Sequence, residues 1–325
     1  MIRFVGVRAF QAAFVMLAVS LIAFSLFRFV GDPISQMVGQ ETAIQDQERL
    51  RESLGLNDPM PVQFARFLGD LLRGDFGFSF RTREPIGEMI LRRLPATVEL
   101  SLVSLFISLG VGIAAGAYTA IRRNTVGAGI VLLVSLVGVS VPTFVIGIAL
   151  IYVFGVELGW LPTFGRGETV DIGWWRTGLL TLSGLKAIIM PSLTLAVYQL
   201  TLTMRLVRSE MMEVLGSDHI RFAEARGLST RSIHYRHALR GTMVPVVTIV
   251  GLQFGGIIAF SIVTESVFQW PGMGLLFLES IRFVDIPVMS VYLVIVAALF
   301  VVINLVVDIA YFAIDPRIRV AGGQG

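Results

Sequence analysis

The sequence predicts an all-α membrane protein that crosses the bilayer about six times, and two observations support this prediction. The chain of 325 residues is 55% hydrophobic and only 15% charged, with a mean hydropathy of +0.78, which is too apolar for a water-soluble core of this size. Its apolar residues are also gathered into long blocks, and most of these reach the roughly 20 residues that cross about 30 Å of hydrocarbon as helix. The blocks cover residues 9–27, 96–120, 126–154, 187–203, 244–263 and 288–314.

Three of these blocks carry features that qualify the expected helices. The first follows Arg3 and Arg8, as a signal peptide would, but it is long and no clear small-residue cleavage pattern follows it, so we expect a retained helix. The block at 126–154 contains Pro142, which is expected to kink or break it. The block at 187–203 reaches spanning length only if Lys186 and Arg205 snorkel to the interfaces.

The distribution of arginine predicts the topology. If the N-terminus is cytoplasmic and six spans alternate, the cytoplasmic segments carry about 13 arginines, whereas the two short opposite loops carry about four basic residues. This asymmetry follows the positive-inside rule, so both termini are expected in the cytoplasm. The long segment 31–95 then lies outside, where its arginines are accompanied by about ten acidic residues.

The outside segment is predicted to form a small subdomain that contains an amphipathic helix. Pro59 and Pro61 suit a helix start, and Gly74 suits its end. Between them the apolar residues Phe64, Phe67, Leu68, Leu71 and Leu72 follow helical spacing. This helix is expected to rest on the bilayer or on the spans, with contact to a soluble partner as the alternative. A second outside stretch, 157–185, contains three tryptophans suited to an interfacial belt, Trp160, Trp174 and Trp175.

The predicted organisation therefore has three parts. Residues 1–30 hold the cytoplasmic N-terminus and the first helix, residues 31–95 hold the extracytoplasmic subdomain, and residues 96–325 hold a five-helix core with a cytoplasmic loop at about 208–243.

The composition excludes several chemistries. The chain has no cysteine, which removes disulfides, thiolate catalysis and cysteine metal sites. Lys186 is the only lysine and does not stand in a P-loop, so the chain is not expected to hydrolyse ATP. His219, His234 and His237 are the only histidines, and no carboxylate pair accompanies them as in a metal site. We expect no catalytic residue, no metal and no cofactor on this chain, and the small net charge of +3 does not require a nucleic acid partner.

The cytoplasmic loop is the most informative segment. Ser217 and Asp218 suit the start of a short helix through Arg226, Gly227 suits a left-handed end, and Ser229 can cap the next helix. The pattern predicts two short helices joined by a glycine elbow. Such a unit is either a projecting contact for a cytoplasmic partner or a solvated basic loop.

This loop resembles the EAA loop of ABC importer permeases, in the variant of the oligopeptide/dipeptide permease family. The resemblance rests on Arg221-Phe222-Ala223-Glu224-Ala225-Arg226-Gly227-Leu228 and on His237-Ala238-Leu239-Arg240 leading to Pro245. Shorter motifs extend it along nearly the whole chain: Gly31-Asp32-Pro33, Gly74-Asp75-Phe76-Gly77, Leu94-Pro95-Ala96-Thr97, Leu158-Gly159-Trp160-Leu161-Pro162, Met190-Pro191-Ser192-Leu193-Thr194, Trp270-Pro271-Gly272 and Asp315-Pro316-Arg317. The chain departs from the general motif at Arg221, Phe222 and Arg240, and the first and third departures are shared with the peptide branch.

The resemblance implies a type I ABC importer permease fold and a set of partners. These are a second homologous permease subunit, two ATPase subunits that bind ATP and Mg, and an extracytoplasmic solute-binding protein, all at the inner membrane of a bacterium. The short helix of the loop would sit in a groove on the ATPase, so the resemblance assigns coupling to Arg221, Phe222, Ala223, Glu224, Ala225, Gly227 and Leu228.

Polar residues and helix breakers within the spans are candidates for the translocation pathway. Those expected to line or gate it are Pro142, Gln199, Thr201, Gln253 and Gly255, and Gly251 and Gly256 are expected to permit close packing of helices. Glu99, Glu265 and Asp308 are ionisable groups within or at the ends of spans, which makes them candidates for the pathway or interfacial residues.

The expected function is transport of di- or oligopeptides. Nickel, glutathione and opines are the alternatives within the family, because substrate choice depends largely on the binding protein. An ATP-independent secondary transporter is the alternative from another class, and the absence of an obvious inverted repeat disfavours it.

Overall fold

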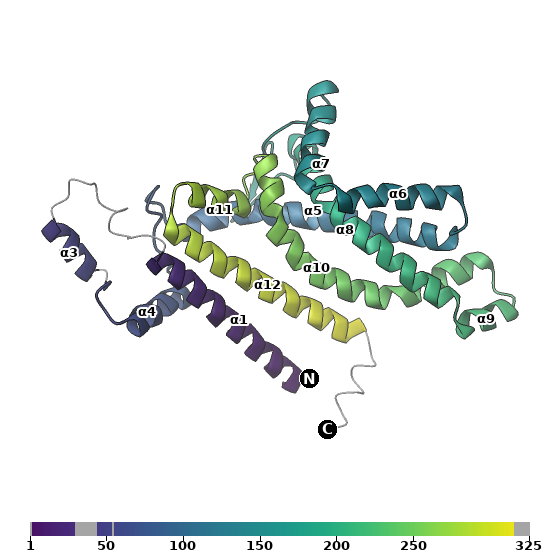
Figure 1. Ribbon diagram of the computed structural model, residues 1–325, viewed down its shortest axis with the longest axis horizontal. Helices are drawn as coiled ribbons and strands as arrows, with labels where there is room; N and C mark the ends of the chain where they lie inside the picture. Colours follow the sequence, from purple (N-terminus) through teal and green to yellow (C-terminus); the bar gives the residue numbers. More distant parts are fainter. Residues whose placement is uncertain (1, 30–43, 54, 315–325) are drawn as a thin grey trace. The chain divides into compact units, whose positions relative to one another are not determined.

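The computed structural model describes residues 2–29, 44–53 and 55–314, which form two compact units. Unit 1 comprises residues 1–95, 173–175 and 272–301, and unit 2 comprises residues 96–172, 176–271 and 302–325. The motifs Gly31-Asp32-Pro33 and Asp315-Pro316-Arg317 lie outside the described residues, as does the side chain of Asp308. The helices are drawn in Figure 1.

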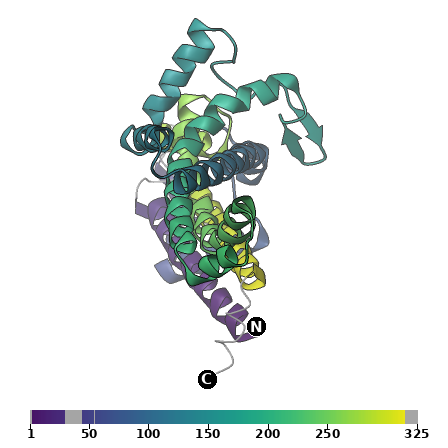
Figure 2. The same cartoon turned by 90° about the vertical axis from the view of Figure 1, so that its right-hand side faces the viewer.

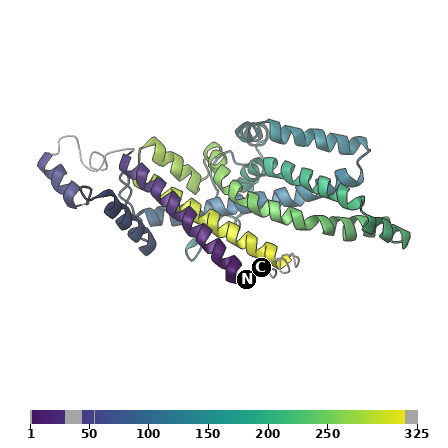
Figure 3. The ribbon, with the colours of Figure 1, turned by 60° about the horizontal axis from the view of Figure 1, so that its bottom comes forward.

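Unit 1 is built on two long helices that pack side by side. Ser290 on α12 donates a hydrogen bond of 3.0 Å to the carbonyl oxygen of Ala23 on α1, and Figures 1 and 3 show the two helices adjacent at these positions. The helices of this unit are α1 (Ile2–Phe29), α3 (Ile44–Ser53), α4 (Met60–Arg73), the start of α5 (Ile86–Ile121), α11 (Met273–Arg282) and most of α12 (Ile286–Ile314).

The amphipathic helix predicted in the outside segment is α4. Pro59 occupies its N-cap, and Gly74 ends it with φ 77°, a left-handed conformation that glycine adopts without steric cost. Phe64 and Phe67 pack against Phe24 of α1, with ring centroids 5.5 and 6.0 Å apart. The predicted helix is confirmed, and these aromatic contacts hold it against the first span.

Unit 2 is organised around α8 (Leu182–Leu215), whose residues are the most buried of the long helices. It packs against α10 and α6, and Figure 3 shows these three helices running alongside one another. The other elements are the rest of α5, α6 (Val126–Ser140), α7 (Thr143–Leu150), the π-helical η1 (Ile151–Glu157), β1 (Val170–Ile172), β2 (Trp175–Thr177), α9 (Asp218–Ala225), the π-helical η2 (Ser232–Ala238), α10 (Leu239–Val267) and the end of α12.

Glycines set the close approach of neighbouring helices to α8. A Cβ atom at Gly116 of α5 would lie 2.7 Å from the carbonyl oxygen of Met204, and one at Gly138 of α6 would lie 2.7 Å from Oγ1 of Thr201. Both distances are shorter than van der Waals contact, so only glycine fits. Of the glycines expected to allow packing on α10, Gly251 does so against Val307, whereas Gly256 has no atom within 4 Å of its Cβ position.

The apolar blocks are helical, and their lengths fit a multi-pass membrane protein. Within the described residues, four helices are long and apolar enough to cross a membrane, and the pair α6 with α7–η1 makes a fifth candidate if it forms one span. The sixth block lies in α10, where Gln253–Val267 forms a shorter apolar stretch. α5 begins at Ile86, before the apolar block at 96–120, so this helix also includes the more polar residues 86–95.

The block that contains Pro142 is broken, as its proline indicates. α6 ends at Ser140, Pro142 is the N-cap of α7, and the two helices are bent by 107°. Figure 1 shows α7 turning away from α6. The ring of a proline removes one backbone donor and blocks the preceding helical turn, so the chain direction changes here.

The loop after η1 adds a small sheet that the apolar pattern does not reveal. β1 and β2 form a two-stranded sheet joined by Gly173 and Trp174, and Figure 2 shows the strands as paired arrows. Gly173 has φ 63°, which suits a tight hairpin turn.

Candidate functional site

The predicted coupling segment forms one short helix, α9, and a second helical segment, η2, which continues without a break into α10, so the second helix is longer than expected. Ser217 is the N-cap of α9 in extended conformation, although its hydroxyl donates backwards to the carbonyl oxygen of Val214 at 2.7 Å instead of capping the helix. Gly227 has φ 74°, and Oγ of Ser229 accepts a hydrogen bond of 3.3 Å from the backbone N–H of Ser232. The glycine elbow and the start of the second helix are therefore confirmed.

The face of α9 that touches the rest of the chain is narrow. Ile220 and Ala223 are buried in a cluster with Met211, Ile233 and Ala238, which come from α8 and η2. Because Ala223 is small, α9 lies close to its own chain at this position, so Ala223 does not face a cytoplasmic partner in this structure. This cluster fixes the direction of α9 from both α8 and η2.

The opposite face of α9 is exposed and partly apolar. On α9, Phe222 is 64% exposed, and beyond the Gly227 elbow Leu228 is 41% exposed; both are large apolar side chains in a segment otherwise rich in charge. The other predicted coupling residues that reach solvent are Arg221, Glu224, Ala225 and Gly227. An apolar side chain held at the tip of a short, fixed helix is suited to fill a groove on another protein.

The histidines lie in the same segment but do not form a metal site. His219 and His237 pack edge to face with ring centroids 6.1 Å apart. Among the described residues, no group of three or more His, Asp or Glu side chains could hold a metal ion.

The predicted pathway residues on α8, Gln199 and Thr201, are buried, and Thr201 contacts α6. Thr201 donates hydrogen bonds to the carbonyl oxygens of Val197 and Ser135, at 3.0 and 3.2 Å. The side-chain nitrogen of Gln199 and the side-chain oxygen of Gln253 are buried without a hydrogen-bond partner in the described part of the chain. Gly255 is buried and Pro142 is exposed. Of the predicted pathway residues, the two glutamines are those with a buried polar atom that lacks a hydrogen-bond partner in the described part of the chain.

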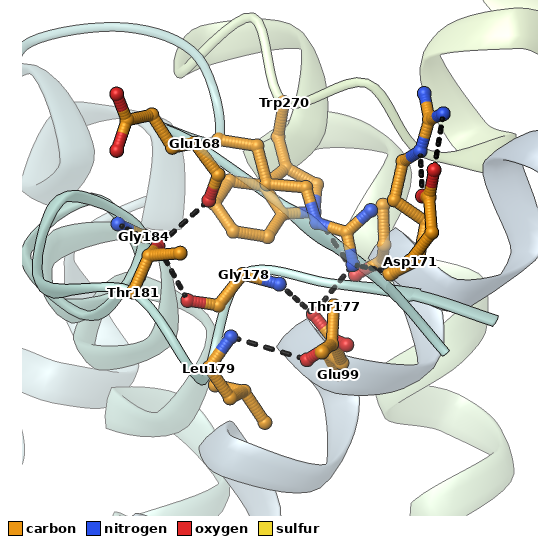
Figure 4. A network of polar contacts seen from close by, with 12 residues as sticks. Glu99, Glu168, Asp171, Thr177, Gly178, Leu179, Thr181, Gly184 and Trp270 are labelled. Carbon is orange, nitrogen blue, oxygen red and sulfur yellow. Dashed lines mark hydrogen bonds and ion pairs between the residues drawn. The ribbon is translucent and has the colours of Figure 1, made fainter.

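A buried ion pair holds the loop between η1 and α8 (residues 158–181), which is called the outer loop after the side predicted for it. Arg166 donates to Oε2 of Glu99 on α5 at 2.5 Å, and the two side chains are 5% and 4% exposed. The same guanidinium donates to the carbonyl oxygen of Arg176 at 2.7 Å, as drawn in Figure 4. The backbone N–H of Gly178 also approaches Glu99, at 3.5 Å. The Glu99 carboxylate on α5 therefore contacts the loop on both sides of the hairpin, at Arg166 before β1 and at Gly178 after β2.

Glu265 forms a second buried polar group in the same unit. Its Oε1 accepts hydrogen bonds from Thr97 at 2.6 Å and Ser261 at 3.2 Å. Close by, the indole N–H of Trp270 donates to the carbonyl oxygen of Ala96 at 2.9 Å. Glu99 and Glu265, which the sequence marks as pathway or interface candidates, are thus engaged in contacts within the protein. Sequence reasoning missed Arg166, although a glutamate in a span requires a buried partner.

The hairpin of the outer loop carries an exposed ion pair. Nε of Arg176 lies 2.6 Å from Oδ1 of Asp171, and this hydrogen bond lowers the pKa of the Asp171 carboxyl below its ordinary value. The same contact raises the pKa of Arg176.

Comparison with known proteins identifies the family. The profile described as binding-protein-dependent transport system inner membrane component matches residues 112–320, and its N-terminal companion matches residues 1–101. The chain belongs to this family. This permease is similar to a dipeptide transport system permease protein of Alkalihalophilus pseudofirmus, at 37% identity over 94% of this chain and 96% of the relative.

Other relatives cover the chain to a similar extent. A probable peptide ABC transporter permease of Sinorhizobium fredii is 38% identical over 94% of this chain and 95% of the relative. A glutathione transport system permease of Escherichia coli is 37% identical over 92% of this chain and 94% of the relative.

A solved structure supports the fold of this permease. The inward-facing MetNI methionine ABC transporter contains a chain that matches with a TM-score of 0.55 at 18% identity, covering 71% of this chain and 99% of that one. The permease therefore has the type I ABC importer permease fold and is a multi-pass membrane protein.

Proposed function

We propose that this permease forms half of a translocation pathway for di- or oligopeptides in a bacterial cytoplasmic membrane. The two relatives named as dipeptide and peptide permeases support the substrate class. The glutathione relative is compatible with the same chemistry, because glutathione is itself a small peptide. Nickel and opines are the alternative substrates for the same import mechanism.

The assembly that we propose has this chain beside a second homologous permease, with two ATPase subunits on the cytoplasmic side. An extracytoplasmic binding protein delivers the solute. ATP and Mg bind to the ATPase subunits, and this chain carries no cofactor and no catalytic residue. Both of its termini lie in the cytoplasm, as the arginine distribution favours.

The observation that carries the coupling role is the construction of α9. Its inner face is anchored through Ile220 and Ala223, while Phe222 and Leu228 extend into solvent. A helix whose direction is fixed in this way can pass a displacement of its partner to α8 and α10. Closure of the ATPase pair on ATP would then shift the spans between inward-open and outward-open states.

The experiment is purification of the chain from its native membrane in mild detergent, with mass spectrometry of the accompanying proteins. We expect an ATPase and a second permease to accompany the wild type and Phe222→Ala to retain less ATPase. Tyr235→Ala is the matched control, because Tyr235 is an exposed aromatic residue of the neighbouring η2. Recovery of the chain without any ATPase, under conditions that preserve other complexes, would point to an ATP-independent transporter.

The substrate is tested by uptake into vesicles supplied with the cognate binding protein. We expect unlabelled peptides to inhibit the uptake of a labelled dipeptide, and nickel or an opine not to inhibit it. Competition by nickel alone would contradict the peptide assignment and leave the importer mechanism standing.

A further inference from the structure

A pocket between α6 and α8 is not used by any of the roles described above. Its volume is about 640 Å³, and it is open on one side. One wall consists of leucines of α6, Leu132, Leu133 and Leu136, and the other presents polar residues of α8, Arg205, Arg208 and Ser209. The pocket thus combines a hydrocarbon surface with two positive charges.

The two arginines have no acidic partner within the described part of the chain. None of the ion pairs there includes Arg205 or Arg208. The Nε atom of Arg208 is buried and makes no hydrogen bond. A buried guanidinium N–H without an acceptor is costly, so this geometry favours an acceptor from outside the chain. Guanidinium binds phosphate and carboxylate groups in bidentate fashion.

The length of α8 brings these arginines to the depth of lipid headgroups if Leu182 lies at the opposite interface. Arg205 follows Leu182, the first residue of α8, by 23 residues, which is about 34 Å of helix and close to the thickness of the hydrocarbon core. Arginines at this depth meet lipid phosphates and direct their charged ends toward the interface.

The leucine wall continues into surface that is exposed on α6. Leu133 is 67% exposed and Val134 is 64% exposed, in a helix that carries no charged residue. A free phosphate would use only the arginines, whereas a lipid would use both walls, because its acyl chain can lie along these leucines while its phosphate meets Arg208.

We propose that this pocket is a binding site for an anionic phospholipid. The phosphate is held by Arg205, Arg208 and the hydroxyl of Ser209, and an acyl chain covers Leu132, Leu133 and Leu136. The bound lipid supplies the counter-charge that the protein lacks at this point of α8.

The test uses the complete complex purified with its accompanying subunits and reconstituted in nanodiscs that contain phosphatidylglycerol and phosphatidylcholine. Native mass spectrometry then measures which lipid remains bound to this subunit. We expect the wild type to retain phosphatidylglycerol. Arg208→Gln should lower the preference of the subunit for phosphatidylglycerol over phosphatidylcholine about five-fold. The double variant Arg205→Gln with Arg208→Gln should lower this preference about 30-fold.

The matched control is Arg122→Gln with Arg123→Gln, which removes the same charge from the exposed turn before α6 and leaves the pocket intact. Its lipid preference should equal that of the wild type. Equal loss in the control and the pocket variants would assign the preference to general surface charge and overturn the proposal.

Two further arms separate the lipid from other occupants. Inorganic phosphate at millimolar concentration should not displace the bound lipid, and displacement by it would identify a free-anion site instead. A crosslinkable residue at Leu133 should react with lipid acyl chains, and reaction with the partner permease alone would show that a protein interface covers the pocket.

Discussion

At the scale of single residues, the most consequential contact is the buried ion pair between Glu99 and Arg166. A buried ion pair stabilises a fold only when each charged group has its partner and its hydrogen bonds. Removal of one side chain leaves the other as a buried charge without a partner. Arg166 is matched by Glu99 and by the carbonyl oxygen of Arg176, which joins the outer loop to α5. The pair therefore determines where the loop lies on its own unit.

Arg166→Met is expected to destabilise the permease by about 3–5 kcal/mol, because it leaves the Glu99 carboxylate buried without a counter-charge. The midpoint of thermal unfolding of the purified complex measures this. The double change Glu99→Leu with Arg166→Met should recover much of the loss, since no charge then remains. Arg176→Gln is the control, because Arg176 is exposed and should change the midpoint little. If the single and double variants unfolded alike, the ion pair would not be the stabilising element.

Gly227 is the residue on which the elbow of the coupling segment depends. Its φ of 74° is unfavourable for any residue with a Cβ, although no atom lies within 4 Å of the position that a Cβ would take. Gly227→Val therefore strains the backbone without a steric clash, and it should redirect α9 and not disrupt the spans.

We expect Gly227→Val to lose most ATP-driven uptake while the complex still assembles. Vesicle uptake and co-purification of the ATPase measure the two effects separately. Gly216→Ala is the matched control, because Gly216 precedes α9 with φ −85° and should tolerate a methyl group. Normal uptake by an assembled Gly227→Val complex would refute the coupling role of the elbow.

At the scale of elements, the hairpin β1–β2 is held by an exposed ion pair that depends on pH. Arg176 lowers the pKa of Asp171 in the folded hairpin, so the contribution of the pair is fully present above the ordinary pKa of an aspartate, about 3.9. The contribution is lost as the pH falls through the lowered, folded-state pKa, because the carboxylate becomes protonated there.

Asp171→Asn is expected to be slightly less stable than the wild type at pH 7, and this difference should shrink as the pH falls below the ordinary aspartate pKa of about 3.9. Thermal unfolding of both proteins across this pH range provides the comparison. A difference that persisted unchanged at pH 3 would exclude the ion pair as its cause.

The docking of α4 on α1 is another feature of this scale. Phe24 is buried and contacts both Phe64 and Phe67. Phe24→Ala should cost about 3–5 kcal/mol and expose α4 to hydrogen exchange, because a cavity forms beneath the helix. Phe14→Ala is the control, since Phe14 lies on the same helix and is largely exposed. Equal exchange of α4 in both variants would contradict this packing.

At the scale of the whole molecule, the side of the membrane on which each loop lies can be measured directly. The chain contains no cysteine, so single cysteines report their side of the membrane without background. Thr230→Cys in the coupling segment should react with an impermeant maleimide only from the cytoplasmic side. Glu168→Cys in the outer loop should react only from outside, since the two exposed positions lie on loops at opposite ends of α8. Labelling of both from one side would invalidate the proposed alternation of spans.

Local features of this protein were predictable from the sequence. The apolar blocks, the ends of α4, the break at Pro142 and the elbow at Gly227 depend on residues within a turn or two of one another. Helical period, proline geometry and glycine conformation act at that range, so the structure agrees with the pattern.

Only the tertiary structure decided the partners of the buried polar residues. Glu99 and Arg166 are 67 positions apart, and their contact depends on how α5 meets the outer loop. Tertiary packing also decides that Ala223 faces its own chain and that the arginines of α8 lie beside the leucines of α6. The sequence determined by itself which segments are apolar enough to enter the membrane and which family the chain resembles, because hydropathy and short motifs are local properties. Packing determined which charges are matched within the chain and which require a ligand from outside.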